Sequence, residues 1–82
     1  MIYYIENQIL KAGISSTGAE LKSLVKNDFE YIWQGDAKYW SYSAPIMFPM
    51  CGRMFEDSYS VNGKVYPMEK HGFCRGAEFE VT

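Results

Sequence analysis

Short apolar runs separated by polar turn residues predict β-strands along most of the chain. Ile2–Ile5 and Gln8–Ile14 are rich in β-branched and aromatic residues, and the polar pair Glu6-Asn7 separates them. This pattern predicts a strand, a tight turn and a second strand. The cluster Ser15-Ser16-Thr17-Gly18 then predicts a turn before the next element.

The stretch from Ala19 to Lys26 fits two elements. Thr17-x-x-Glu20 matches a helical capping box, and the leucines that follow lie at helical spacing. Apolar and polar residues also alternate there, and Asn27-Asp28 is a turn pair that leads into the aromatic run Phe29–Trp33. We therefore favour a second hairpin over a helix.

The strongest local signal is Asn62-Gly63, the dipeptide suited to a two-residue type I′ turn. It predicts a hairpin between Phe55–Val61 and Lys64–Met68. Lys70–Phe73 is expected to be a loop. Ala77–Val81 alternates again and predicts a further strand, which reaches the end of the chain without a closing turn.

The middle of the chain carries the only departure from β patterning. Lys38–Ser43 predicts a short helical turn that ends at Ala44-Pro45, where proline prevents an ordinary helix interior. Pro45–Pro49 is an apolar run between two prolines. We expect its side chains to be buried and its backbone to be irregular or at a sheet edge.

These elements predict an all-β fold of antiparallel strands. A chain of 82 residues buries a small share of its surface, and sandwiches with strands at this spacing often need about 200 residues to close. Residues 1–82 are therefore expected to form one N-terminal fragment of a larger β-sandwich domain, without an internal boundary. Exposed strand edges at Ile2 and Val81 would favour self-association between chains.

Composition and charge exclude several classes of partner. The net charge is −2 and the pI about 5.2, with no basic run, which argues against a nucleic-acid surface. No apolar stretch approaches a membrane span, and Met1–Leu10 lacks the features of a signal peptide, so we expect a cytoplasmic protein. Cys51 and Cys74 lack the spacing of a zinc site.

Arg53 and His71 are the polar residues most suited to binding chemistry. Arg53 follows Gly52 after the Pro-bounded run and could grip hydroxyl or carboxylate oxygens, or instead form a surface ion pair with Glu56 or Asp57. His71, the only histidine, is followed by a glycine. It could donate a hydrogen bond, relay a proton, or serve a structural role.

Two further groups of side chains suit a sugar site but fit ordinary roles as well. Aromatic residues could pack on the apolar face of a sugar ring or form a core. They are Trp33, Tyr39, Trp40, Tyr42 and Phe73. Acidic residues could act as acid and base, but their adjacent or alternating positions are typical of a solvated face. They are Glu56, Asp57, Glu69, Glu78 and Glu80.

Five motifs in a fixed order resemble the beginning of aldose 1-epimerase-like proteins. They are Gly18-Ala19-Glu20-Leu21-Lys22-Ser23-Leu24, Trp33-Gln34-Gly35-Asp36, Tyr39-Trp40, Pro45-Ile46-Met47-Phe48-Pro49 with Gly52-Arg53, and His71-Gly72-Phe73. The chain is most similar to the bacterial hexose mutarotase-like branch, and the resemblance covers nearly its whole length. It implies a large antiparallel β-sandwich of the galactose mutarotase type.

The resemblance also implies a function. Members are isomerases of carbohydrate metabolism that interconvert the α and β anomers of free hexoses without a metal or organic cofactor. It implies that Arg53 and His71 face a hexose or a sugar derivative, with Arg75 as an additional candidate contact. In the family the catalytic acid is a second histidine and the base a glutamate, and both are expected beyond Thr82. The resemblance thus implies substrate binding here and no catalytic residue.

Two other functions fit the same residues. A non-catalytic carbohydrate-binding β-sandwich module could present arginine, histidine and aromatic side chains to a sugar with no reaction following. Alternatively, a plain β-domain could use its aromatic residues for a core or a dimer interface, so that Arg53 and His71 would affect stability alone.

Overall fold

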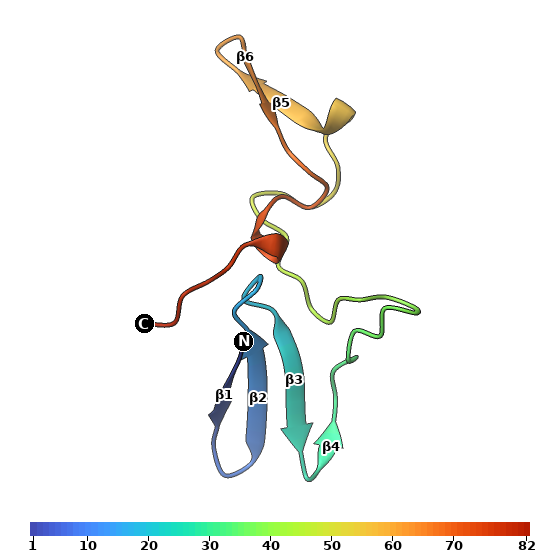
Figure 1. Cartoon of the computed structure of the whole chain (residues 1–82), viewed down its shortest axis with the longest axis vertical. Coiled ribbons are helices and arrows are strands. Elements are labelled where there is room, and N and C mark those ends of the chain that lie inside the picture. The colour runs from blue at the N-terminus through green and yellow to red at the C-terminus, as the bar shows by residue number, and fades with distance from the viewer.

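The computed structural model describes all residues, 1–82, and consists of two separate antiparallel sheets (Figure 1). The first has four strands in the order β1-β2-β3-β4, and the second is the hairpin β5-β6. The strands are β1 (Ile2–Glu6), β2 (Leu10–Ser15), β3 (Leu21–Lys26), β4 (Phe29–Glu30), β5 (Ser58–Val61) and β6 (Lys64–Pro67). Two short 3₁₀ turns complete the structure: η1 (Phe55–Asp57) and η2 (Cys74–Gly76). The expected all-β antiparallel architecture is confirmed.

The first predicted hairpin is confirmed as β1 and β2. Its register runs from Ile2 opposite Ser15 to Glu6 opposite Lys11. The turn depends on Asn7, whose side-chain oxygen accepts hydrogen bonds from the N–H groups of Ile9 and Leu10, each at 2.8 Å. A side chain that satisfies the free backbone donors in this way stabilises a tight turn.

The second hairpin, which we favoured over a helix, is confirmed as β3 and β4. Asn27 and Asp28 take left-handed φ angles of 52° and 62°, which suits a two-residue turn. The return strand ends early, at Glu30. The Glu30 carboxylate accepts hydrogen bonds from the N–H groups of Leu24 and Ile32, and so takes the place of backbone carbonyls of a longer strand.

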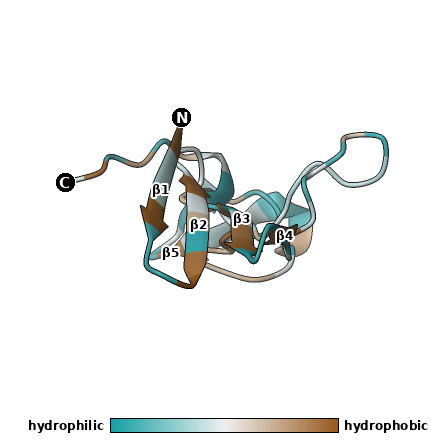
Figure 2. Ribbon diagram, turned by 90° about the horizontal axis from the view of Figure 1, so that it is seen from below, coloured by the Kyte–Doolittle hydropathy of each residue, from teal (hydrophilic) through white to brown (hydrophobic).

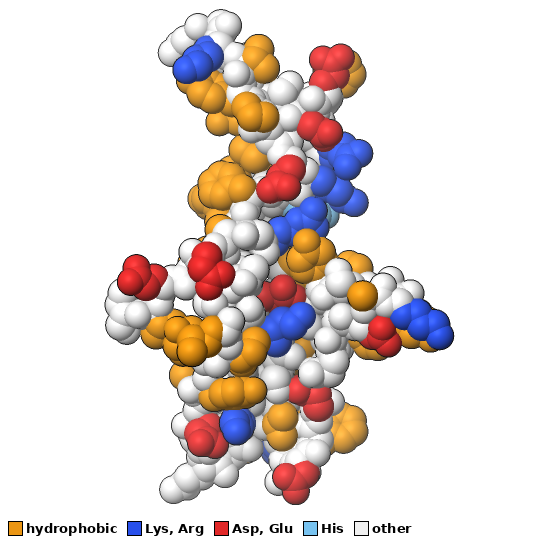
Figure 3. Space-filling model, in the orientation of Figure 1, with side chains coloured by type: hydrophobic (Ala, Val, Ile, Leu, Met, Phe, Trp, Pro, Cys, Tyr) orange, Lys and Arg blue, Asp and Glu red, His pale blue; other side chains and the backbone are white.

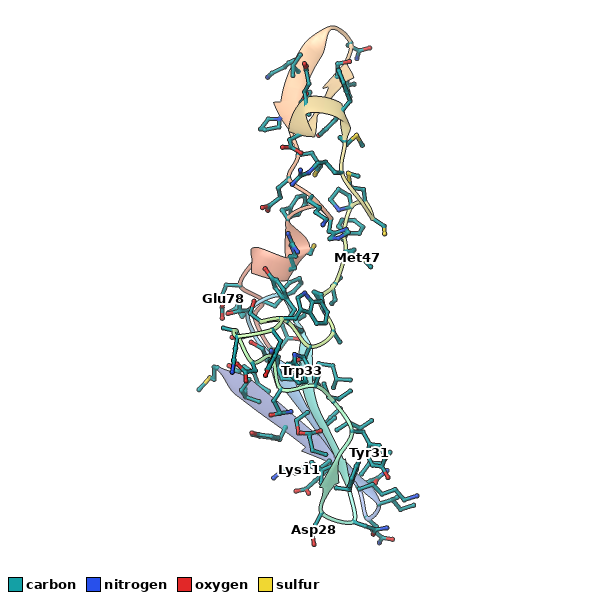
Figure 4. The ribbon with its side chains drawn as sticks, turned by 90° about the vertical axis from the view of Figure 1, so that its right-hand side faces the viewer. Lys11, Asp28, Tyr31, Trp33, Met47 and Glu78 are labelled. Atoms are coloured by element: carbon teal, nitrogen blue, oxygen red, sulfur yellow. The ribbon has the colours of Figure 1, made fainter.

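The middle of the chain is irregular. The short helical turn predicted at Lys38–Ser43 is present but begins two residues earlier, because the carbonyl of Asp36 accepts from the N–H groups of Tyr39 and Trp40, both at 2.9 Å. The irregular backbone of Pro45–Pro49 is as expected, but its apolar side chains are not buried: Phe48 is 55% exposed. No other part of the chain covers the side chains of Ile46, Met47 and Phe48, which are 41–55% exposed. Figure 4 shows Met47 in this stretch between the two sheets.

The Asn62-Gly63 hairpin is confirmed as β5 and β6. Val61 pairs with Lys64, and Tyr59 stacks on Tyr66 with ring centroids 5.3 Å apart. The first strand begins three residues later than predicted, because Phe55–Asp57 forms the turn η1.

The strand predicted at Ala77–Val81 is wrong. This segment makes a single bridge, between Glu78 and Thr17. Its partner is the turn at Ser16–Gly18, and a turned backbone offers no straight edge along which a ladder could extend. The Glu78 carboxylate instead accepts hydrogen bonds from the hydroxyls of Ser16 and Thr17, and the Ser16 bond is the main reason that the pKa of Glu78 lies below its ordinary value.

The molecule is extended and has almost no core. Its radius of gyration is 16.0 Å, whereas a compact chain of this length would have about 12 Å. Only six of 82 residues are buried, and Met68 is the one buried apolar side chain larger than glycine or alanine. Figure 2 shows apolar stretches along β1, β2 and β3, and apolar side chains of these strands, such as Ile5 and Leu10, are exposed. No helix in the structure has the length and apolar character needed to cross a membrane.

Candidate functional site

Arg53 and His71 lie near one another because two distant segments of the chain are bonded side by side. Phe48 and Gly72 form a parallel bridge, and the Phe48 carbonyl accepts from the N–H groups of Phe73 at 2.9 Å and Cys74 at 3.3 Å. This contact lies between the two sheets, where the chain ascends to β5 and returns from β6 (Figure 1). It holds the Gly-Arg and His-Gly-Phe motifs together.

Gly72 is required for this contact. A Cβ atom at this position would lie 2.0 Å from the Phe48 carbonyl oxygen, far closer than any real contact. Its φ of +78° is also unfavourable for a residue with a side chain. The glycine of the His-Gly-Phe motif therefore allows the two segments to approach.

His71 is bonded to Gly52 at both its backbone and its ring. The His71 N–H donates to the Gly52 carbonyl at 2.6 Å, and the Gly52 N–H donates to His71 Nδ1 at 2.8 Å. His71 itself has a left-handed φ of 64°, a conformation that costs free energy and that the surrounding bonds maintain. The imidazole is half-buried, and its other nitrogen, Nε2, makes no hydrogen bond within the chain.

Arg53 is mostly exposed and is paired with an acid on the turn that precedes β5. Its Nε lies 3.1 Å from Asp57 Oδ1, and the two side chains are 64% and 55% exposed. The ion pair expected as the alternative for Arg53 is thus present, and such an exposed pair contributes about 0–1 kcal/mol. The pair engages Nε and leaves the donors on the outer edge of the guanidinium available to a ligand.

The residue before and the turn after Arg53 have unusual backbones. Gly52 has a φ of +97°, and nothing would obstruct a Cβ atom there, so the position requires glycine for its conformation alone. Glu56 and Asp57 both take left-handed φ angles, of 55° and 52°. Strained residues of this kind cluster at functional sites, and here they bring Asp57 back to Arg53.

The other candidates divide between this region and the rest of the chain. Phe73 packs edge-on against Phe48 at 6.3 Å between ring centroids, and both rings are about half exposed beside the motif that contains His71. Arg75 lies over the ring of Tyr42 at 5.1 Å and makes no ion pair. Glu78 belongs to the Ser16–Thr17 turn and so has a structural role.

The remaining aromatic candidates form edge-on or tilted pairs in the irregular segment. Trp33 packs on Tyr39 at 6.1 Å, and Trp40 on Tyr42 at 6.2 Å. The Trp33 indole N–H also donates to the Trp40 carbonyl at 2.8 Å. These contacts order the segment itself, and Figure 4 shows Trp33 at the level of the first sheet.

The sequence singled out Arg53 and His71 as candidates but did not show what connects them. The connecting groups are the Gly52 N–H and the Phe48 carbonyl, which are backbone atoms and leave no mark in side-chain type. The one signal was the pair of glycines, Gly52 and Gly72, beside the two candidates. Figure 3 shows a group of Lys and Arg side chains on the face of the molecule between the two sheets.

Comparisons with known proteins identify the family. The family model described as aldose 1-epimerase matches residues 1–82. The plasmid and chromosomal LacX proteins of Lactococcus lactis subsp. lactis are each 34% identical over 85 aligned positions, which cover 96% of this chain and 28% of theirs.

Two solved structures contain a segment with the same fold as this chain. A galactose mutarotase-like protein from Lactobacillus casei is 45% identical with a TM-score of 0.93, over 100% of this chain and 29% of that one. A galactose mutarotase related enzyme from Lactobacillus acidophilus is 43% identical with a TM-score of 0.93, over 98% of this chain and 27% of that one. This chain thus spans less than a third of the length of these relatives, and it belongs to the aldose 1-epimerase family.

Proposed function

We propose that this chain carries the substrate-holding part of a site that interconverts the α and β anomers of a hexose or hexose derivative. Arg53 and His71 bind sugar hydroxyls and stabilise negative charge as it develops on oxygen, which is a task of orientation and electrostatics. Arg75 is an additional candidate contact. The observation that supports this most is the bonding of His71 to Gly52, which brings two cationic or donor side chains of distant segments together.

The reaction needs two proton-transfer groups besides these donors. A base removes the proton of the anomeric hydroxyl while an acid protonates the ring oxygen. The ring opens, the C1–C2 bond rotates, and closure with the transfers reversed gives the other anomer. The chain contains one histidine. We propose that the acid and the base, a histidine and a glutamate, come from the part of the family domain beyond the segment that matches this chain.

The exposed surface supports a role within a larger β-sandwich. The accessible surface is 6456 Å², about 1,400 Å² more than a compact protein of 9.5 kDa would expose. An excess of that size is comparable to one side of an obligate interface. In our proposal, further strands cover the apolar faces of the sheets. The isolated chain would then be inactive, and its open edges would favour self-association.

The decisive experiment is a chimera in which this chain replaces the matching 29% of the Lactobacillus casei protein. Fresh α-D-glucose or α-D-galactose is added, and the loss of optical rotation is followed with the chimera, the parent protein and the isolated chain. We expect acceleration by the parent and the chimera and none by the chain alone. Sugar binding by the chimera without acceleration would favour a carbohydrate-binding module instead, and no acceleration by parent or chimera with any free hexose would contradict the substrate class.

A further inference from the structure

We propose that the Gly52 N–H is a positioning group that fixes His71 as the Nε2–H tautomer, so that this histidine meets a ligand only as a hydrogen-bond donor. The tautomer follows from geometry alone. The consequence for a sugar rests on the function proposed above.

The bond to Nδ1 determines where the proton of the ring lies. A neutral imidazole has one nitrogen that donates and one that accepts. The Gly52 N–H can only donate, and it points at His71 Nδ1 across 2.8 Å. Nδ1 must therefore be the unprotonated nitrogen, and the ring proton of the neutral side chain is on Nε2.

The donor is a backbone group, and it cannot rotate away. Gly52 and His71 are bonded reciprocally, since the His71 N–H donates to the Gly52 carbonyl at 2.6 Å. The neighbouring Phe48–Gly72 bridge holds the same two segments. A side-chain partner could change rotamer, whereas this arrangement changes only if the two segments separate.

The hydrogen bond to Nδ1 places the ring proton of His71 on the opposite nitrogen from that of a catalytic base. In a base of the serine protease type, a carboxylate accepts the proton of Nδ1, which leaves Nε2 free to take a proton from the substrate. No acid contacts His71 here: the two ion pairs of the chain join Glu20 to Lys22 and Asp57 to Arg53. A backbone donor at Nδ1 makes Nε2 a donor.

The site then presents donors from both motifs. The Nε2–H of His71 and the outer edge of the Arg53 guanidinium can only donate hydrogen bonds. Such a pair suits lone pairs on a hydroxyl or ring oxygen and the negative charge that develops there. It offers no acceptor for a hydroxyl proton, so acceptors must come from other groups.

The test uses the full chain, selectively labelled with ¹⁵N at histidine and at glycine, at a mildly alkaline pH and without sugar. Because His71 is the sole histidine, its ring signals need no assignment to a residue. The couplings of each nitrogen to the two ring C–H protons distinguish Nδ1 from Nε2. We expect Nδ1 to resonate as an unprotonated nitrogen and Nε2 as an N–H nitrogen. We also expect a scalar coupling across the hydrogen bond between the Gly52 nitrogen and Nδ1. A proton on Nδ1, or the mixture of tautomers of a free imidazole, would overturn the proposal.

A pair of variants in the chimera tests the role separately from the tautomer. Asn at position 71 can place an oxygen near Nδ1 and accept from Gly52 but has no donor near Nε2, whereas Gln can place an N–H near Nε2. We expect His71→Gln to retain more sugar affinity than His71→Asn, by about tenfold or more for one recovered hydrogen bond to a buried partner. The reverse order would overturn the donor role while leaving the proposed function open.

Discussion

Replacement of Gly72 by alanine should break the contact that brings Arg53 and His71 together. The added Cβ would lie 2.0 Å from the Phe48 carbonyl oxygen, where ordinary contacts begin at 3.4 Å. The two segments would have to separate by more than an ångström. That movement removes the hydrogen bonds that the Phe48 carbonyl accepts from Phe73 and Cys74.

Two costs add to give the magnitude. Alanine at the left-handed φ of +78° costs about 1–2 kcal/mol relative to glycine. Loss of the two hydrogen bonds costs about 0.5–1.5 kcal/mol for each bond. We therefore expect Gly72→Ala to lower the free energy of unfolding by about 2–5 kcal/mol.

Two other glycines provide matched controls. Gly63 shares the left-handed φ, at +80°, but its Cβ would meet open space, so Gly63→Ala should show the conformational cost alone, about 1–2 kcal/mol. Gly76 has neither an unfavourable φ nor a close neighbour, so Gly76→Ala should change stability by less than about 0.5 kcal/mol. Urea unfolding of the three chimeras, followed by tryptophan fluorescence, measures the series. A Gly72→Ala cost no larger than that of Gly63→Ala would show that a side chain at position 72 does not clash with the Phe48 carbonyl.

Three further predictions concern single side chains. Asp57→Asn should lower the free energy of unfolding by less than about 1 kcal/mol, because the ion pair with Arg53 is exposed. The loss should shrink in 1 M salt, which screens exposed charges. A larger loss in urea titrations that does not depend on salt would contradict this prediction. The pKa values of Glu30 and Glu78 are lowered from 4.5, chiefly by the hydrogen bonds from Ser23 to Glu30 and from Ser16 to Glu78. The two ionised carboxylates therefore stabilise the folded chain above pH 4.5, and this contribution is lost as the pH falls through their lower pKa values in the folded state. Glu78→Gln and Glu30→Gln should therefore flatten the decline in stability below pH 4.5, and an unchanged acid profile in circular dichroism would contradict the assignment.

The hairpins could be predicted because their signals are local. Asn27-Asp28 and Asn62-Gly63 tolerate left-handed φ angles, so the turn residues alone indicate where the chain reverses. The prediction of a strand at Ala77–Val81 was wrong for the converse reason. Its alternation is that of a strand, but a strand also needs a straight partner, and the chain supplies only the turn at Ser16–Gly18.

The burial of side chains and the geometry of the site could not be predicted from local sequence patterns, because both depend on contacts between distant parts of the chain. Phe48 lies in an apolar run typical of a core, yet whether it is buried depends on what packs against it, and these residues leave it 55% exposed. Arg53 and His71 became candidates through their chemistry and neighbouring glycines, and then through the order of motifs in the family. Their connection through the Gly52 N–H could not be predicted, because every residue except proline has such a group.

If Arg53 and His71 hold the sugar, their removal must slow turnover. Arg53→Ala and His71→Ala in the chimera should each lower kcat/KM for mutarotation by about 10²–10³, the usual cost of removing a donor that stabilises developing charge on oxygen. Urea unfolding would verify that each variant remains folded. Polarimetry that shows both variants turning over hexose at the rate of the unmodified chimera would contradict the claim that these two residues hold the sugar.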